Sequence, residues 1–244
     1  MTGVQTCALP ISAGRLDGHE LRGTLCRGEP GAGESSRGEE GGYAHPRMVA
    51  VPATPPPFVS RAERVTAADL RYSWHRGCPV GPSQLRRVRL GYMGFDGKPH
   101  SGQLVVNASV VHDVVVVFRT LYRARFPIRQ MKPIDVFHGS DDRSAAADNT
   151  SAFNCRQAVA SGPTSWSMHA YGKAVDVNDV ENPYFVGSRV IPPAGKAYRN
   201  RANVRPGMAV EGGVLVRAFA SVGWGWGGRW AASPDYQHFS SNGR

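Results

Sequence analysis

The 244-residue chain has only four cysteines and no long apolar run. No stretch approaches the roughly 20 apolar residues that a membrane-spanning helix needs, so the sequence predicts no transmembrane segment. No Lys/Arg run is interleaved with aromatic residues as in a nucleic-acid groove, so nucleic acid is not an expected partner. A G-x-S-x-G turn, a phosphate-binding glycine loop and an H-E-x-x-H helix are also missing. The sequence therefore gives little support for catalysis by an activated serine. It also gives no support for a zinc protease of the common helical H-E-x-x-H type.

The cysteines divide into two groups. Cys7 and Cys26 lie in a low-complexity N-terminal stretch, which leaves Cys78 and Cys155 as an even pair in the remainder. A disulfide between them would close a long loop and would suit an exported protein. Two buried free thiols are the alternative. Neither cysteine has the C-x-x-C spacing of a metal site, so cysteine ligation of zinc is not expected.

The first 47 residues do not resemble a folded domain. Residues 2–11 read TGVQTCALPI, which resembles the translation of a sequencing adapter. The stretch that follows is rich in Gly, Glu, Arg and Ser, and it has no apolar periodicity with which to build a core. We therefore predict that residues 1–47 are an artefactual or disordered leader that is no part of the fold. The alternative to an artefact is a leader that belongs to the natural protein and is disordered. Met48 is a plausible start, and an export signal could have been lost.

The remaining 197 residues suffice for one domain with a sizeable core. Residues 48–65 are predicted to be a Pro-rich linker, and residues 66–244 form the predicted catalytic domain. From Met48 onward, 24 Lys and Arg face 13 Asp and Glu, a net charge of +11. A positive field of this size favours polyanionic surroundings. With no nucleic-acid groove predicted, the anionic polymers of a bacterial wall are the expected environment.

Hydrophobic patterns predict several elements. Residues 90–95 and 103–107 read as two strands around turn residues, and residues 134–137 read as a short strand. An apolar stripe at helical spacing over residues 110–122 predicts the main core helix. Residues 214–222 predict a second helix that ends at a glycine.

Two short signatures carry the candidate chemistry. Residues 167–176 read SMHAYGKAVD, and residues 235–239 read DYQHF. A catalytic zinc ion takes three protein ligands and leaves one position for water, and His169, Asp176 and His238 could fill those three places.

Asp235 would then remain free beside the metal, where a carboxylate can accept a proton from water and pass it to a leaving amine. Alternation after Gly172 places Asp176 on one face of a strand and Val175 with Val177 on the other. The two valines are expected to be buried while Asp176 points into a cleft. The sequence thus predicts a hydrolytic zinc site of metallopeptidase type.

The pattern S-x-H-x-x-G-x-A-x-D followed by D-x-x-H resembles the M15 family of zinc peptidases over about residues 90–240. The family includes bacterial D-Ala-D-Ala carboxypeptidases and L-alanyl-D-glutamate endopeptidases of phage lysins. The resemblance implies that His169, Asp176 and His238 bind one Zn²⁺ and that Asp235 is the catalytic base. It also implies a compact α+β domain of the DD-peptidase and hedgehog type, in which a small antiparallel sheet carries the ligands and helices pack on its other side.

The family has an arginine in an S-G-Y-R-S-like stretch that contacts the substrate or the developing oxyanion. Here residues 140–144 read SDDRS, so Arg143 is the candidate, with a salt bridge to a neighbouring aspartate as the alternative. Ser167, Tyr171 and Trp226 are candidates for lining the cleft, although packing or capping roles carry equal weight. Three tryptophans among the glycines of residues 224–230 indicate a packed wall beside the site.

The aspartate at 235 resembles the endopeptidase branch more than the carboxypeptidases, which often carry E-x-W-H. We therefore expect an L-Ala-D-Glu endopeptidase-like enzyme acting on peptidoglycan stem peptides, with a D-Ala-D-Ala carboxypeptidase as the alternative. A non-catalytic wall-binding module and a structural zinc domain are further alternatives. A monomer that is secreted or held in the cell envelope is expected.

Overall fold

A three-stranded antiparallel sheet begins the described part of the chain. The computed structural model describes residues 56–159 and 164–244, which all belong to one unit, Pro52–Arg244. Strands β1 (Ser60–Arg64), β2 (Leu85–Met93) and β3 (Pro99–Asn107) pair in that order. The predicted hairpin turn lies between β2 and β3; both strands begin earlier than predicted, and β2 ends two residues before the predicted end of its run.

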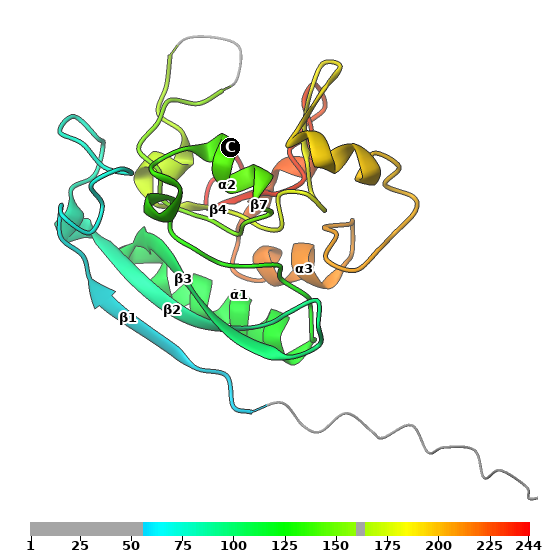
Figure 1. Ribbon diagram of the computed structural model, residues 1–244, viewed down its shortest axis with the longest axis horizontal. Coiled ribbons are helices and arrows are strands. Elements are labelled where there is room, and N and C mark those ends of the chain that lie inside the picture. Colours follow the sequence, from blue (N-terminus) through cyan, green and yellow to red (C-terminus); the bar gives the residue numbers. More distant parts are fainter. Residues whose placement is uncertain (1–55, 160–163) are drawn as a thin grey trace, which may run out of the picture. The chain divides into compact units, whose positions relative to one another are not determined.

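Helix α1 (Val111–Arg123) packs on β2, as Figure 1 shows, and its buried face belongs to the main hydrophobic core. Its buried face is the predicted stripe, and it packs against alternate side chains of β2 and β3. The residues of this contact are Val88, Leu90, Leu104, Val106, Val114, Val117, Phe118 and Leu121. The predicted core helix is thus confirmed despite its many β-branched residues, because packing of its apolar face outweighs their modest cost in helix propensity.

The predicted strand at residues 134–137 is wrong, because this run forms a 3₁₀ helix, η3 (Ile134–Phe137). Pro133 precedes it, and the next residue after it, His138, has a left-handed backbone with φ of 56°. Asp135 accepts hydrogen bonds from the backbone N–H groups of Tyr72 and Ser73 at 2.9 and 3.2 Å. The run therefore anchors the loop that contains Tyr72 and Ser73 instead of pairing with a strand.

A second antiparallel sheet has the order β4-β8-β7, and a separate hairpin pairs β5 with β6. The strands are β4 (Ala174–Asp176), β5 (Tyr184–Val186), β6 (Arg189–Ile191), β7 (Gly225–Trp226) and β8 (His238–Ser240). The remaining helices are α2 (Asp141–Ala146), α3 (Val214–Ala220), η1 (Pro82–Gln84), η2 (Ala108–Val110), η4 (Met168–Tyr171), η5 (Pro193–Tyr198) and η6 (Gly227–Arg229).

The second sheet rests on the same hydrophobic core as α1. Val175 and Val177 are fully buried in it, as the alternation predicted, and Phe239 of β8 stacks on Phe219 of α3 with ring centroids 4.2 Å apart. The predicted helix at 214–222 is confirmed as α3, which ends at Ala220, and Gly223 with φ of +80° lies three residues beyond that end. The prediction of an α+β protein with a small antiparallel sheet is confirmed. Among the described residues, no helix is both long and apolar enough to cross a membrane.

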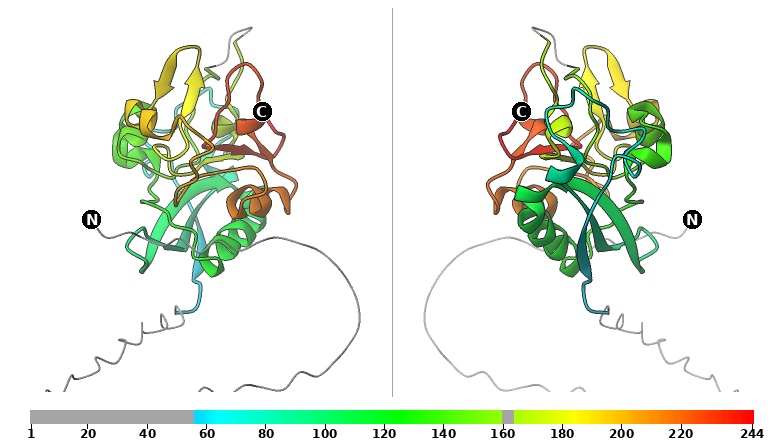
Figure 2. Two further views of the ribbon diagram at one scale, coloured as in Figure 1. Left: turned by 90° about the vertical axis from the view of Figure 1, so that its right-hand side faces the viewer. Right: turned by 90° about the vertical axis from the view of Figure 1, so that its left-hand side faces the viewer.

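The β5–β6 hairpin and the chain on either side of residues 160–163 project from the end of the molecule opposite α1. Both elements can be followed in Figures 1 and 2, where the hairpin is yellow. The bases of both projections lie beside the second sheet, because Tyr184 bridges to Asp235 and Asp176 bridges to Ser151. This arrangement places a recess over the ends of β4 and β8.

Candidate metal centre and cleft

Three buried side chains converge at the junction of η4, β4 and β8. His169, Asp176 and His238 are 2%, 7% and 6% exposed. The two carboxylate oxygens of Asp176 lie 3.1 Å from His169 Nε2 and 3.1 Å from His238 Nδ1, and these two ring nitrogens are 3.1 Å apart. The structure therefore brings together the three residues predicted as metal ligands.

Hydrogen bonds on the far sides of both imidazoles determine which nitrogens carry protons. His169 Nδ1 donates to the carbonyl of Ala152 at 2.5 Å, and His238 Nε2 donates to the carbonyl of Arg244 at 3.1 Å. A carbonyl oxygen can only accept, so each neutral ring has its unprotonated nitrogen facing Asp176. Three lone-pair donors then point at one another with no proton between them, an arrangement that favours a bound cation.

The donor set fits zinc. With metal–ligand bonds of about 2.0–2.1 Å, a tetrahedral ion holds its ligand atoms roughly 3.3 Å apart, close to the spacing here. Two imidazoles and a carboxylate are also ligands that zinc prefers. Although burial opposes ionisation, the two imidazoles hold the pKa of Asp176 well below its usual range, so this candidate ligand is anionic.

Local backbone features place His169. Ser167 caps η4, and its hydroxyl accepts a hydrogen bond from the His169 N–H at 3.3 Å. Gly172 ends the turn with φ of +65°, and its carbonyl accepts from Asn107 N at 2.8 Å. A Cβ on Gly172 would lie 2.7 Å from Asn107 N, so the close approach to β3 requires glycine.

Antiparallel pairing places the other two ligands. Asp176 ends β4 and lies directly opposite His238, the first residue of β8. Side chains of directly paired residues project on the same face of a sheet. Because Val175 and Phe239 form the next pair and lie in the core, Asp176 and His238 face the other way, toward the recess.

Asp235 lies in the same recess and is 9% exposed. Its backbone N–H donates to the Gly227 carbonyl at 3.0 Å, while its buried Oδ1 has no hydrogen-bond partner among the described residues. Burial, followed by the charge of Asp176, raises the pKa of Asp235 to about 7. A carboxyl group that is nearly balanced between its two protonation states is suited to proton transfer near neutral pH.

The recess is a cleft of about 910 Å³, and the three candidate metal ligands and Asp235 all line it. Its walls include aromatic side chains from three separate segments, Trp166, Tyr171, Tyr184 and Trp230. Charged groups also line it, among them Lys173, Arg189 and the buried Asp179, whose pKa burial raises well above its usual range. Apolar walls with a few polar groups are typical of a ligand site, and this volume lies toward the upper end of such sites.

The arginine in this cleft differs from the one expected. Arg143 is exposed on α2 and does not line the cleft, whereas Arg156 does. Arg156 forms an ion pair with Asp141, which also accepts a hydrogen bond from Asn154 Nδ2 at 2.7 Å. Ser140 caps α2 by accepting a hydrogen bond from the Arg143 backbone N–H at 3.2 Å, and nothing in the local spacing of the sequence singled out Arg156.

The predicted cleft residues have different environments. Ser167 and Tyr171 line the cleft, and Ser167 also has its capping role. Trp226 packs in the core and donates from Nε1 to the Tyr236 carbonyl at 2.9 Å, so it supports the site from behind. Trp230 takes the cleft position instead, with its ring centroid 5.3 Å from that of His238. The glycine-flanked tryptophans indicated a wall without showing which of them faces the cleft.

Cys78 and Cys155 form a disulfide in the structure. The bond joins the loop before η1 to the segment that carries Arg156, across a sequence separation of 77 residues.

Comparison with known families agrees with this site. Residues 161–241 match the family model Peptidase_M15_4, described as D-alanyl-D-alanine carboxypeptidase. The match covers about a third of the chain and includes the three candidate metal ligands and Asp235. It confirms the predicted M15 resemblance and suggests a hydrolytic peptidase. No curated protein and no solved structure shows significant similarity to the chain.

Proposed function

We propose that this protein is a zinc-dependent peptidase that hydrolyses amide bonds in peptidoglycan stem peptides. The observation that carries the proposal is the convergence of His169, Asp176 and His238 in one cleft with an unligated, buried carboxylate, Asp235. Zinc held by the three donors would supply a Lewis acid for the scissile carbonyl and a bound water of lowered pKa.

The protein's own groups divide the remaining work. Asp235 accepts a proton on its carboxylate from the attacking water and delivers it to the departing amine. Its Oδ1 has no hydrogen-bond partner in the described part of the chain, which suits that atom to the transfer. The Arg156 guanidinium is suited to stabilise the developing oxyanion or a substrate carboxylate. The aromatic walls hold the peptide in place and exclude water from it.

We further propose the L-Ala-D-Glu bond as the one cleaved, because the residue three before His238 is aspartate, as in the endopeptidase branch. The description of the matching family favours the D-Ala-D-Ala bond as the second candidate. Mass spectrometry of digested peptidoglycan separates the two. New peptides that begin at D-Glu support the first, and loss of a terminal D-Ala supports the second.

Two single substitutions test the mechanism. Asp235→Asn keeps a side chain of the same shape, so it should retain zinc while lowering kcat by about 10²–10⁴-fold. His238→Ala removes a ligand and should lose both metal and turnover. Hydrolysis at the normal rate by the metal-free protein would refute the proposal. If intact protein binds peptidoglycan without cleaving it, the chain is a wall-binding module or a structural zinc domain.

Substitution of each of the two arginines tests which guanidinium acts on the substrate in the cleft. Arg156→Ala should lower kcat/KM by about 10²–10³-fold because it removes a charged group from the cleft wall. Arg143→Ala removes an identical side chain from an exposed helix surface and should leave kcat/KM unchanged. A loss in Arg143→Ala with Arg156→Ala unchanged would return the role to the position expected from the family pattern, and equal losses would contradict a role specific to Arg156.

We also propose that the enzyme works as a monomer in the cell envelope or outside the cell. The disulfide supports an oxidising compartment, and the net positive charge supports association with anionic wall polymers. Sedimentation of the protein with purified walls, at low and high salt, tests the electrostatic part of this proposal.

A further inference from the structure

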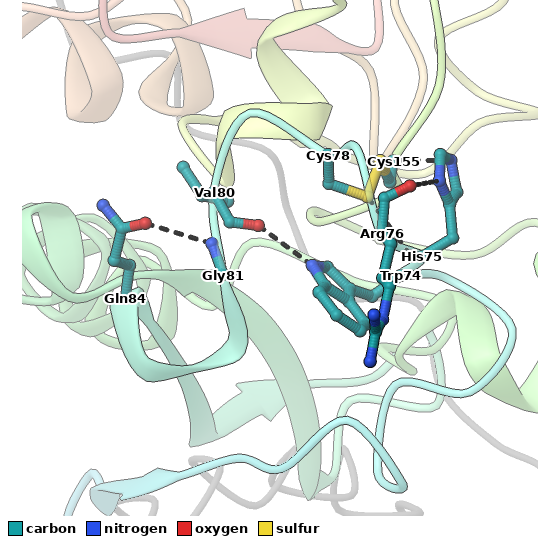
Figure 3. The surroundings of a disulfide bond; sticks show 8 residues. All are labelled: Trp74, His75, Arg76, Cys78, Val80, Gly81, Gln84 and Cys155. Atoms are coloured by element: carbon teal, nitrogen blue, oxygen red, sulfur yellow. Dashed lines mark hydrogen bonds between the residues drawn. A yellow bond between two sulfur atoms is a disulfide. The ribbon is translucent and has the colours of Figure 1, made fainter.

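A second cluster of metal-binding side chains surrounds the disulfide. One nitrogen of His75 and the sulfurs of Cys78 and Cys155 all lie within 4.8 Å of one another. Figure 3 shows the His75 ring beside the bonded sulfurs. His75 and Cys78 are three residues apart in one loop, and the fold brings in Cys155 from a distant segment. A search for C-x-x-C spacing does not detect such a set.

The imidazole of His75 is oriented as a ligand would be. Its Nδ1 donates to the carbonyl of Arg76 at 2.8 Å, so the proton is on Nδ1. The unprotonated Nε2 then faces Cys155 Sγ at 3.5 Å. A hydrogen bond from the other ring nitrogen to a carbonyl is the usual support of a metal-bound histidine, because it sets the tautomer and the ring orientation.

The cysteine sulfurs also have surroundings that favour thiolates after reduction. The backbone N–H of His75 donates to Cys78 Sγ at 3.2 Å, a contact that stabilises negative charge on that sulfur. Cys155 is largely buried, but Cys78 is partly exposed and His75 is exposed, so a reductant and an ion can reach the cluster from one side.

We propose that reduction converts this disulfide into a second zinc site made of His75, Cys78 and Cys155. A dithiol donates two electrons to the disulfide and becomes a disulfide itself, and its two protons pass to the cysteine sulfurs. Zn²⁺ then displaces both protons and binds two thiolates and His75 Nε2, with water as the fourth ligand.

The backbone geometry allows this change. Tetrahedral zinc with bonds of about 2.3 Å to sulfur holds two thiolates roughly 3.8 Å apart. The Cα atoms of Cys78 and Cys155 are 5.9 Å apart, so side-chain rotation is sufficient to reach that spacing. After the disulfide opens, bound zinc would still hold Cys155, and with it the neighbouring Arg156, against the loop that contains His75 and Cys78.

Zinc content of the full-length protein tests the proposal directly. The chain is reduced with a phosphine, freed of reductant under anaerobic conditions, and compared with oxidised protein after equilibration with zinc. We expect about one equivalent of zinc when oxidised and about two when reduced. Cobalt(II) should give thiolate-to-metal charge-transfer absorption only in the reduced form. Equal zinc content in the two forms, or no thiolate band, would overturn the proposal.

Variants separate this site from the cleft. His238→Ala disables the cleft ligands, so it should bind no zinc when oxidised and one equivalent when reduced. If it binds zinc when oxidised, the proposed cleft site fails while the gain on reduction still tests the second site. His75→Ala should weaken the reduction-dependent site at least about tenfold, because loss of a ligand exceeds the usual effect of an outer-shell change. His100→Ala, which removes a histidine paired with Asp96, is the matched control and should have no effect.

A thermal melt covers the case in which reduction unfolds the chain. Zinc should raise the Tm of the reduced protein and leave the Tm of an oxidised His238→Ala sample unchanged. A reduced chain that binds zinc but stays unfolded by circular dichroism would overturn the proposal, because the site requires the folded arrangement.

Discussion

Gly172→Ala tests how the first sheet supports the candidate metal centre. Gly172 ends the turn that carries His169 and lies against β3. The added methyl group would strain a left-handed backbone and would lie 2.7 Å from Asn107 N and 2.9 Å from Leu85 Cδ2. The turn would have to move away from the sheet, and the metal ligand would move with it.

The expected cost has two parts. Alanine in the left-handed region costs about 1–2 kcal/mol relative to glycine. Displacement of the turn also weakens the hydrogen bond from Asn107 N to the Gly172 carbonyl, and a buried donor left unpaired costs about 1–3 kcal/mol. We therefore expect Gly172→Ala to lower the free energy of unfolding by about 2–5 kcal/mol in total.

Gly212→Ala is the matched control for this substitution. Gly212 has φ of +67°, nearly the same as the +65° of Gly172, and no atom lies within 4 Å of a Cβ built there. It should show the backbone strain alone, about 1–2 kcal/mol in urea unfolding. Zinc affinity, measured by competition with a chelator, should fall for Gly172→Ala only. Equal losses of stability in the two variants would refute the argument from close approach.

Three further predictions concern the metal, the core and an exposed carboxylate. Removal of zinc with a chelator should lower the urea midpoint, and zinc should restore it, because binding to the folded site is coupled to folding; His238→Ala should not respond. Phe239→Ala removes a fully buried ring beside His238, so calorimetry should show a loss of about 3–5 kcal/mol, and a loss below about 1 kcal/mol would contradict the packing described. Hydrogen bonds from Thr66 and then from Arg87 lower the pKa of Asp69 to about 2, so this group adds stability above its ordinary pKa of 3.8 that is lost as the pH falls toward 2. Thr66→Val should make urea stability less dependent on pH in that range, and an unchanged profile would contradict the assignment.

The sequence was most informative where one pattern served both structure and chemistry. Alternation around Asp176 predicted that Val175 and Val177 would be buried and that Asp176 would face a cleft, and the structure agrees because β4 has one face in the core. The α1 stripe was predictable for the same reason, since its period matches its buried face.

Prediction failed where a distant segment decides the outcome. The apolar residues around Val136 favour a strand locally, but Asp135 holds the run against a loop more than 60 residues away, where its carboxylate accepts backbone hydrogen bonds. Which arginine enters the cleft depends on how the end of the Cys155 segment packs, and which tryptophan faces His238 depends on the turn at η6. Neither is encoded in the spacing of the motifs.

The segment that matches the peptidase family is not self-sufficient. The carbonyl that orients His169 belongs to Ala152, the N–H that holds Gly172 belongs to Asn107, and the residue that bridges to the backbone of Asp176 on the side away from β8 is Ser151, all of which precede residue 161. A graft of residues 161–241 onto another scaffold would carry every candidate ligand but leave behind the groups that aim two of them. Any portable version of this site must therefore begin at or before β3.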